Sequence, residues 1–171
     1  MVGMTVREAS LADAPAIAQI HVATWRAAYR GMIPDDYLNS LSVDQRMARW
    51  SKAVSAPGPA KVAVAHMKDE IIGFCSFGPT RDEAPPDTAE LYSLNVRPDC
   101  WRRGAGRVLC EYAYRQAALR QHTAITLWVL KQNEGARRFY ERLGYLPDGA
   151  EKTDIDLTGS PLNDVRYRKA V

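Results

Sequence analysis

The 171-residue sequence lacks any long apolar run and contains few cysteines. Its apolar stretches stay well short of the roughly 18 residues that a membrane-spanning helix requires. Residues 1–8 also lack the basic-then-apolar order of a secretory signal. We therefore expect a cytosolic protein that is neither inserted into a membrane nor secreted.

The three cysteines, Cys75, Cys100 and Cys110, do not show the spacing of a metal site, and their odd number argues against a disulfide framework. Small buried thiols are the simpler interpretation for all three. Cys100 lies beside a glycine-containing segment, but the sequence offers it no evident histidine partner, which argues against a nucleophilic role. We therefore expect neither a metal nor a catalytic thiol.

The charge balance is mild, with a formal net charge of +3. A nucleic-acid-binding protein usually carries a concentrated basic stripe, whereas the local excess here is confined to the arginines of residues 102–107. A phosphorylated small molecule explains that excess equally well. The 46% hydrophobic and 25% charged fractions are ordinary for a globular protein, and the length predicts one domain over residues 1–171.

Residues 101–107, Trp-Arg-Arg-Gly-Ala-Gly-Arg, lie between a strand-like segment, 90–96, and a helical one. A helix start offers unpaired N–H groups and the positive end of a dipole to a phosphate. Gly104 and Gly106 have no Cβ, so a ligand can approach the backbone. Leu109 stands where a dinucleotide fingerprint needs its third glycine, and no Gly-Lys-Ser/Thr occurs. The pattern indicates a phosphorylated cofactor that is neither a dinucleotide nor a nucleoside triphosphate.

Hydrophobic periodicity and turn residues predict a strand, two or three helices, three strands, a helix, a strand, a helix and two strands. The predicted strands cover 5–8, 61–66, 71–77, 90–96, 125–130, a segment from 145, and 164–168. The predicted helices cover a segment capped by Ser10 and ending at residues 30–31, a segment from Ser42, 106–120 and 133–143. Residues 33–38 are predicted to form a short turn or a further helical piece. Gly31 and Gly144 are expected to end helices.

Two motifs resemble those of the GCN5-related N-acetyltransferase (GNAT) superfamily, of the bacterial small-molecule type. Residues 101–106 resemble its pyrophosphate loop, Arg/Gln-x-x-Gly-x-Gly/Ala, although Trp101 departs from the basic first position. Residues 133–145 are similar to its second signature, Asn-x-x-Ala-x-x-Phe-Tyr-x-x-x-Gly-Phe/Tyr. The resemblance implies an α/β (α+β) fold: a mixed, mostly antiparallel sheet of about seven strands, splayed between strands four and five and flanked by helices.

The resemblance implies an acetyl-CoA-dependent enzyme that moves an acetyl group directly to a primary amine of a small molecule in a ternary complex. Two alternatives stay open. In the first alternative, the acceptor is a protein amino terminus, a lysine or an aminoacyl-tRNA. In the second, the chain is a non-catalytic module that binds acyl-CoA. A homodimer is a further expectation from the family.

The same resemblance implies that pantetheine lies along the exposed edge of strand four and pairs with its backbone as an added strand would. The implied cofactor-binding residues are Leu94, Asn95, Val96, Arg102, Arg103, Gly104, Ala105, Gly106, Arg107, Asn133 and Arg137. Two of them have simpler alternatives. Asn133 is also suited to cap its helix, and Arg137 to be a solvated helix charge.

Direct transfer needs a base that deprotonates the ammonium and an acid that protonates the departing thiolate. Tyr140 matches the family's acid position, with aromatic packing as the alternative. Glu90, at the head of strand four, is the expected base and is expected to face the cleft, with water as the alternative. Aromatic faces suit a cationic amine. The residues expected to bind it are Trp25, Tyr29, Tyr37 and Tyr92, with core packing as the alternative for the first two.

Overall fold

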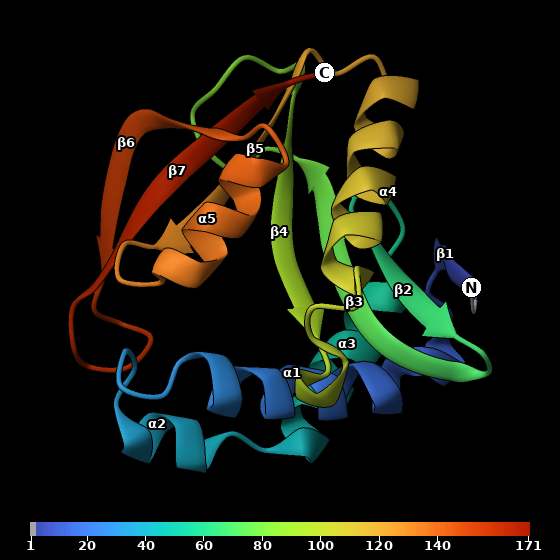
Figure 1. Ribbon diagram of the computed structural model, residues 1–171, viewed down its shortest axis with the longest axis vertical. Coiled ribbons are helices and arrows are strands. Elements are labelled where there is room, and N and C mark those ends of the chain that lie inside the picture. Colours follow the sequence, from blue (N-terminus) through green and yellow to red (C-terminus); the bar gives the residue numbers. More distant parts are fainter. Residues whose placement is uncertain (1–2) are drawn as a thin grey trace.

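The computed structural model describes residues 3–171, which fold around one seven-stranded sheet (Figure 1). The strands are β1 (Met4–Glu8), β2 (Lys61–Met67), β3 (Glu70–Pro79), β4 (Thr88–Val96), β5 (Ala124–Leu130), β6 (Leu146–Asp154) and β7 (Leu162–Ala170). Their order across the sheet is β1-β2-β3-β4-β5-β7-β6. The β4–β5 pair is parallel and the other pairs are antiparallel, which confirms the mixed, mostly antiparallel sheet.

The helices lie on both faces of the sheet, and their order along the chain is the predicted one. They are α1 (Ala14–Ala28), α2 (Asp35–Ser40), α3 (Val43–Ser55), α4 (Ala105–Leu119) and α5 (Glu134–Arg142), with short 3-10 turns at Leu11–Asp13 and Pro98–Cys100. In Figure 1, α1, α2 and α3 lie together, apart from α4 and α5. No helix within residues 3–171 has the length and apolar character needed to cross a bilayer.

Strand β3 shows why both faces of the sheet are covered. Successive side chains of a strand point to opposite faces. Phe74 packs with Ile17 of α1 and Trp50 of α3, while Cys75 packs with Leu109 of α4. Both β3 residues are fully buried. The near-continuous apolar run of this segment therefore reflects a strand enclosed between two helical layers.

The helix ends follow local rules with one exception. Ser42 Oγ accepts a hydrogen bond from the Gln45 N–H at the start of α3, and Gly31 and Gly144 adopt positive φ angles after α1 and α5. The exception is α1, which begins at Ala14, because the 3-10 turn occupies the residues after Ser10. The expected cap, Ser10, is therefore the N-cap of this turn, and the α-helix begins later than predicted.

The most consequential feature of the sheet is that β4 and β5 pair over only four residues each, Thr88–Leu91 with Ala124–Leu127. Beyond Leu127, β5 continues along β7, whereas β4 continues along β3. A register shift between β3 and β4 leaves Tyr92 as an extra residue, and such a bulge bends its strand. The two strands consequently part, as expected, and leave a gap in the middle of the sheet.

Replacing Asp13 with asparagine should lower the free energy of unfolding by about 2 kcal/mol at pH 7. Hydrogen bonds from the Arg7 guanidinium, and then from Ser10, outweigh burial and lower the pKa of Asp13 from 3.8 to about 2. This stabilisation is complete above the unfolded-state pKa and is lost as the pH falls through about 2. Urea unfolding at several pH values measures it. The exposed Asp99→Asn is the control and should change stability little; a loss for Asp13→Asn that does not shrink in acid would contradict the prediction.

Candidate functional site

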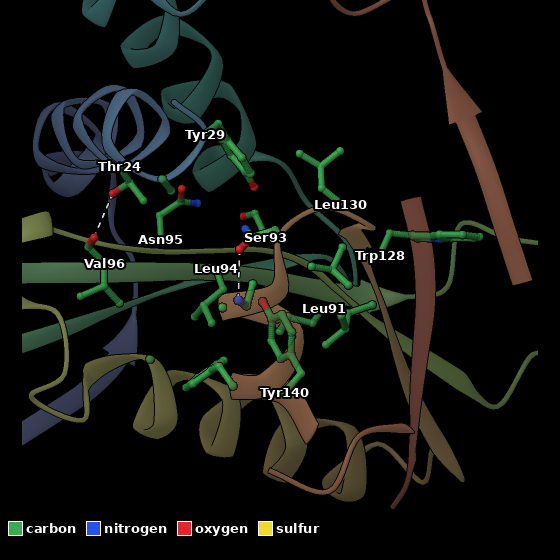
Figure 2. Close-up of a pocket in the computed structure, with 18 of the residues that line it drawn as sticks. Thr24, Tyr29, Leu91, Ser93, Leu94, Asn95, Val96, Trp128, Leu130 and Tyr140 are labelled. Carbon is green, nitrogen blue, oxygen red and sulfur yellow. Dashed lines mark hydrogen bonds between the residues drawn. The ribbon is translucent and has the colours of Figure 1, made fainter. Parts of the chain in front are cut away.

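A cavity of about 1190 Å³ occupies the gap between β4 and β5 (Figure 2). Its walls come from elements that are distant in the sequence. They include residues 91–96 of β4, residues 127–130 of β5, the end of α1, the start of α4, the inner side of α5, and parts of β6 and β7. The parting of the two strands therefore creates a large concave site, the usual location of a ligand site.

The backbone of β4 offers hydrogen-bonding groups to this cavity. The Arg97 N–H donates to the Ile72 carbonyl at 2.8 Å, which makes the Gly73–Val96 pair a non-hydrogen-bonded pair of the antiparallel ladder. The N–H and C=O groups of Val96, and of Leu94 two residues earlier, therefore point away from β3 and into the gap. This is the arrangement that an extended, amide-containing ligand needs for pairing as an added strand.

The Val96 carbonyl already accepts two hydrogen bonds at the end of this edge. Thr24 Oγ1 donates to it at 3.0 Å (dashed in Figure 2), and Trp101 Nε1 donates at 2.7 Å. Trp101, the irregular position of the glycine-arginine run, thus folds back onto the end of β4. It ties the loop before α4 to the strand that precedes it.

The two glycines at the start of α4 serve different needs. Gly104 has a φ of +90° and caps α4, and an added Cβ would enter open space. At Gly106, by contrast, an added Cβ would lie 3.1 Å from the Phe139 ring. Gly104 is thus required by the turn, and Gly106 by the close packing of α5 on α4.

Most of the predicted cofactor residues line the cavity: Leu94, Asn95, Val96, Arg102, Gly104, Ala105, Gly106, Arg107 and Asn133. Asn133 also caps α5, because its Oδ1 accepts a hydrogen bond from the Ala136 N–H at 3.1 Å. The cap and the cavity position are compatible with each other.

Arg103 and Arg137 do not line the cavity. The Arg137 guanidinium donates to Tyr167 Oη at 3.0 Å and to the Lys131 carbonyl at 3.1 Å, so it is committed to the other side of α5. Arg138 and Arg142, one turn apart on α5, line the cavity instead. The expectation that Arg137 faces the cofactor is therefore corrected by the rotation of the helix about its axis.

Tyr140 reaches the cavity from α5, and Tyr29 reaches it from the end of α1. Figure 2 shows their hydroxyl groups directed toward each other across the gap. Burial, and the nearby Cys110 and Tyr29, raise the pKa of Tyr140 well above its ordinary value. The phenol is therefore protonated at physiological pH and is able to donate a proton or a hydrogen bond.

Glu90 does not face the cavity. Only 1% of it is exposed, and its carboxylate accepts hydrogen bonds from the Arg81 backbone N–H at 2.9 Å and from Arg81 Nη2 at 2.6 Å. Arg81 in turn lies over the Tyr92 ring, 4.2 Å from its centroid, and both Arg81 and Tyr92 line the cavity. The expected orientation of Glu90 is therefore wrong, and its carboxylate lies behind Arg81.

Three of the four predicted acceptor-binding aromatics, Trp25, Tyr29 and Tyr92, line the cavity. Tyr37 does not: it packs beside Trp25, with ring centroids 6.4 Å apart, and its hydroxyl accepts a hydrogen bond from Arg46. Tyr37 is therefore placed to support the aromatic wall from behind.

Several cavity residues were not expected from the sequence, namely Thr24, Trp128, Leu130, Lys152, Asp154, Leu162 and Asp164. Most of them lie on the β5-β7-β6 half of the sheet. Alternation along residues 162–166 does place Leu162 and Asp164 on one face. However, only the strand order shows that this face borders the gap beside β4.

One family model and several known proteins match most of this chain. A family model described as the acetyltransferase (GNAT) family matches residues 16–145. An uncharacterized N-acetyltransferase of Bacillus subtilis (strain 168), YuaI, is 38% identical over 165 residues, which cover 95% of this chain and 90% of that protein. A probable N-acetyltransferase of Mycobacterium tuberculosis is 29% identical over 166 residues, covering 95% and 91%.

Solved structures share the fold at lower sequence identity. The PaiA N-acetyltransferase of Thermoplasma acidophilum, in complex with coenzyme A, has a TM-score of 0.75 and 19% identity over 99% of both chains. YncA of Salmonella typhimurium, a putative acetyltransferase with acetyl-CoA, has a TM-score of 0.72 and 24% identity over 98% of this chain and 93% of that one.

Replacing Arg81 with methionine should lower the free energy of unfolding by roughly 2–4 kcal/mol, because it leaves the buried Glu90 carboxylate without its cation. Urea unfolding measures the loss. Arg97→Met is the matched control, since its partners Glu70 and Asp99 are exposed and solvent already screens them. Equal losses of unfolding free energy in the two variants would show that the buried Glu90 carboxylate does not need the Arg81 cation for its stability.

Proposed function

The chain belongs to the acetyltransferase (GNAT) family, and we propose that it transfers the acetyl group of acetyl-CoA directly to a primary amine of a small molecule in a ternary complex. The observation that carries the proposal is the gap between β4 and β5, where an open backbone edge, a helix start and the Tyr140 hydroxyl border one cavity. Each part suits a different portion of acetyl-CoA.

The residues around the gap fit a CoA-type molecule along its length. The outward N–H and C=O groups of Leu94 and the N–H of Val96 match pantetheine amides. The start of the 15-residue helix α4 suits the pyrophosphate, because its N–H groups are unpaired within the helix and Gly104 leaves the backbone accessible. Four arginines at the cavity wall supply opposite charge: Arg102, Arg107, Arg138 and Arg142. The CoA and acetyl-CoA complexes of the two structural relatives support the assignment.

We assign the proton donor to Tyr140. In the transfer, the C–S bond of the thioester breaks as the amine nitrogen forms a C–N bond to the acetyl carbon, so the departing thiolate needs a proton. The neutral Tyr140 phenol supplies it. The nitrogen must first lose a proton, and we assign the acceptor of that proton to water, since Glu90 is buried behind Arg81.

The acceptor side of the cavity supports a small amine. Tyr29 at the end of α1, Ile33 in the segment before α2, and Leu162 at the start of β7 enclose it. Ile33 and Leu162 are almost fully buried. Such walls suit an apolar stem behind the reacting nitrogen. Acetylation of peptides or of aminoacyl-tRNA, without turnover of free amines, would overturn this choice of acceptor.

Calorimetric titration with acetyl-CoA should show saturable binding, and Arg138→Met should weaken it about fivefold, the effect of losing one exposed charge contact. Arg103→Met is the control, because Arg103 carries the same charge but does not line the cavity. Absence of saturable binding to the unmodified protein would refute the proposed function. Equal weakening by the two variants would refute the assignment of Arg138.

Tyr140→Phe should lower kcat by at least about 100-fold, as expected for loss of a general acid, with the Kd for acetyl-CoA unchanged. Release of free thiol from acetyl-CoA, in the presence of a panel of primary amines, measures the rate. Because the pKa of Tyr140 is raised, its titration should cause no loss of kcat between pH 6 and pH 10.

Tyr145→Phe is the matched control for this variant. Its ring lies 5.9 Å from that of Tyr140, but its hydroxyl is buried outside the cavity, without a hydrogen-bond partner among the described residues. Its kcat should stay close to that of the unmodified enzyme. An unchanged kcat in Tyr140→Phe would remove this residue from the mechanism.

A further inference from the structure

A carboxylate on β7 distinguishes the acceptor side of the cavity. Asp164 is the cross-strand neighbour of Leu130 on β5 and of Lys152 on β6. It lies two residues after Leu162, so the two side chains share a face of the sheet. Leu130 and Leu162 pack in one cluster with Tyr29. Asp164 therefore faces α1 and forms part of the cavity wall.

Within residues 3–171, the Asp164 carboxylate makes no hydrogen bond and no ion pair. The cations closest to it in the sheet are engaged with other groups. Lys152 Nζ lies 4.3 Å from the centroid of the Trp128 ring. Arg166 Nε donates to Asp148 at 2.7 Å, and its Nη1 lies 3.3 Å from Asp82.

The other carboxylate of this wall is already occupied. Asp154 Oδ1 accepts hydrogen bonds from the backbone N–H groups of Asp156 and Leu157, at 2.9 and 3.1 Å. Burial has the largest effect on the pKa of Asp164 and raises it. The positive charge of Lys152 lowers this pKa in part, and Asp154 raises it. A half-buried carboxylate without a partner is costly, and a cation brought by a ligand would offset that cost.

The position of Asp164 along the sheet separates it from the place of chemistry. β4 and β5 part after Leu127, and Leu130, the neighbour of Asp164, lies three residues farther along β5. At the rise of a strand this is about 10 Å. In Figure 2, the Tyr140 hydroxyl lies near Leu91 and Leu94, on the far side of the gap from Leu130. A cation bound at Asp164 therefore lies at a different place in the cavity from the nitrogen that reacts beside Tyr140.

We propose that Asp164 binds a second ammonium group of the acceptor, so that the enzyme prefers alkyl diamines and polyamines to amines with a single charge. The proposal rests on the proposed acetyltransferase function and names its acceptor class. One nitrogen forms an ion pair with Asp164, the apolar stem lies along Leu130, Leu162 and Ile33, and the other nitrogen reaches the thioester. Binding the remote nitrogen leaves the reacting one able to lose its proton, whereas a carboxylate on the reacting nitrogen would hold that proton.

The experiment compares amines of equal length that differ in one charge: putrescine against butylamine, and cadaverine against pentylamine. With acetyl-CoA saturating, kcat/KM should be about 10- to 100-fold higher for the diamine of at least one pair, through a lower KM, in the range of a hydrogen-bonded charge contact. In Asp164→Asn the ratio should fall to within about threefold of unity, while the Kd for acetyl-CoA and the monoamine kcat/KM stay within about twofold.

Glu151→Gln is the matched control, because it makes the same carboxylate-to-amide change on neighbouring β6 at an exposed residue paired with Lys131. It should keep the ratio of the unmodified enzyme. Calorimetric titration of the CoA-bound enzyme with the diamines gives a second readout that does not require turnover, and Asp164→Asn should weaken this binding about 10-fold or more.

Equal kcat/KM for diamines and monoamines in the unmodified enzyme would overturn the proposal and leave the acetyltransferase function intact. The same conclusion follows if Asp164→Asn retains the preference. Saturable acetyl-CoA binding without turnover of any free amine would instead overturn the small-molecule function itself. Because the first comparison uses only the unmodified enzyme, it does not depend on the folding of a variant.

Discussion

The site depends on the early end of the β4–β5 pairing. The two parallel strands pair only as far as Leu91 and Leu127, after which each follows a different antiparallel neighbour. Beyond that point, the backbone groups of Leu94 and the Val96 N–H have no neighbouring strand on the gap side, whereas the Val96 carbonyl already accepts from Thr24 and Trp101. Polar backbone groups in a protein interior require partners. The gap therefore favours a ligand that brings its own amides.

The surrounding elements keep this gap open and give it two different sides. Thr24 and Trp101 both donate to the Val96 carbonyl, which links α1 and the start of α4 to the same end of β4. Side chains alternate along β4, so Leu94 and Val96 face α4, while Ser93 and Asn95 face α1 (Figure 2). A ligand along the β4 edge is thus accessible from both layers, and Tyr140 and Tyr29 approach it from opposite sides.

Positively and negatively charged side chains line different parts of the same cavity. Arginines of α4 and α5 line one part of its wall, and Asp154 and Asp164 line another. Arg81 is neutralised by the buried Glu90, so it contributes a planar group over Tyr92 more than a free positive charge. This division suits a phosphorylated donor on one side and a cationic acceptor on the other. It also explains why the net charge of +3 revealed little about the acceptor.

The sequence by itself determined the order of the elements, the caps at Ser42 and Asn133, the glycine-arginine turn before α4 and the family to which these motifs point. These features depend on periodicity and on contacts within a few residues, which a single sequence displays. Tertiary structure alone decided that Glu90 is held by Arg81, that Arg138 rather than Arg137 borders the cavity, and that Asp164 does so as well. Those outcomes depend on helix rotation and on β7 lying between β5 and β6, and both are set by long-range packing.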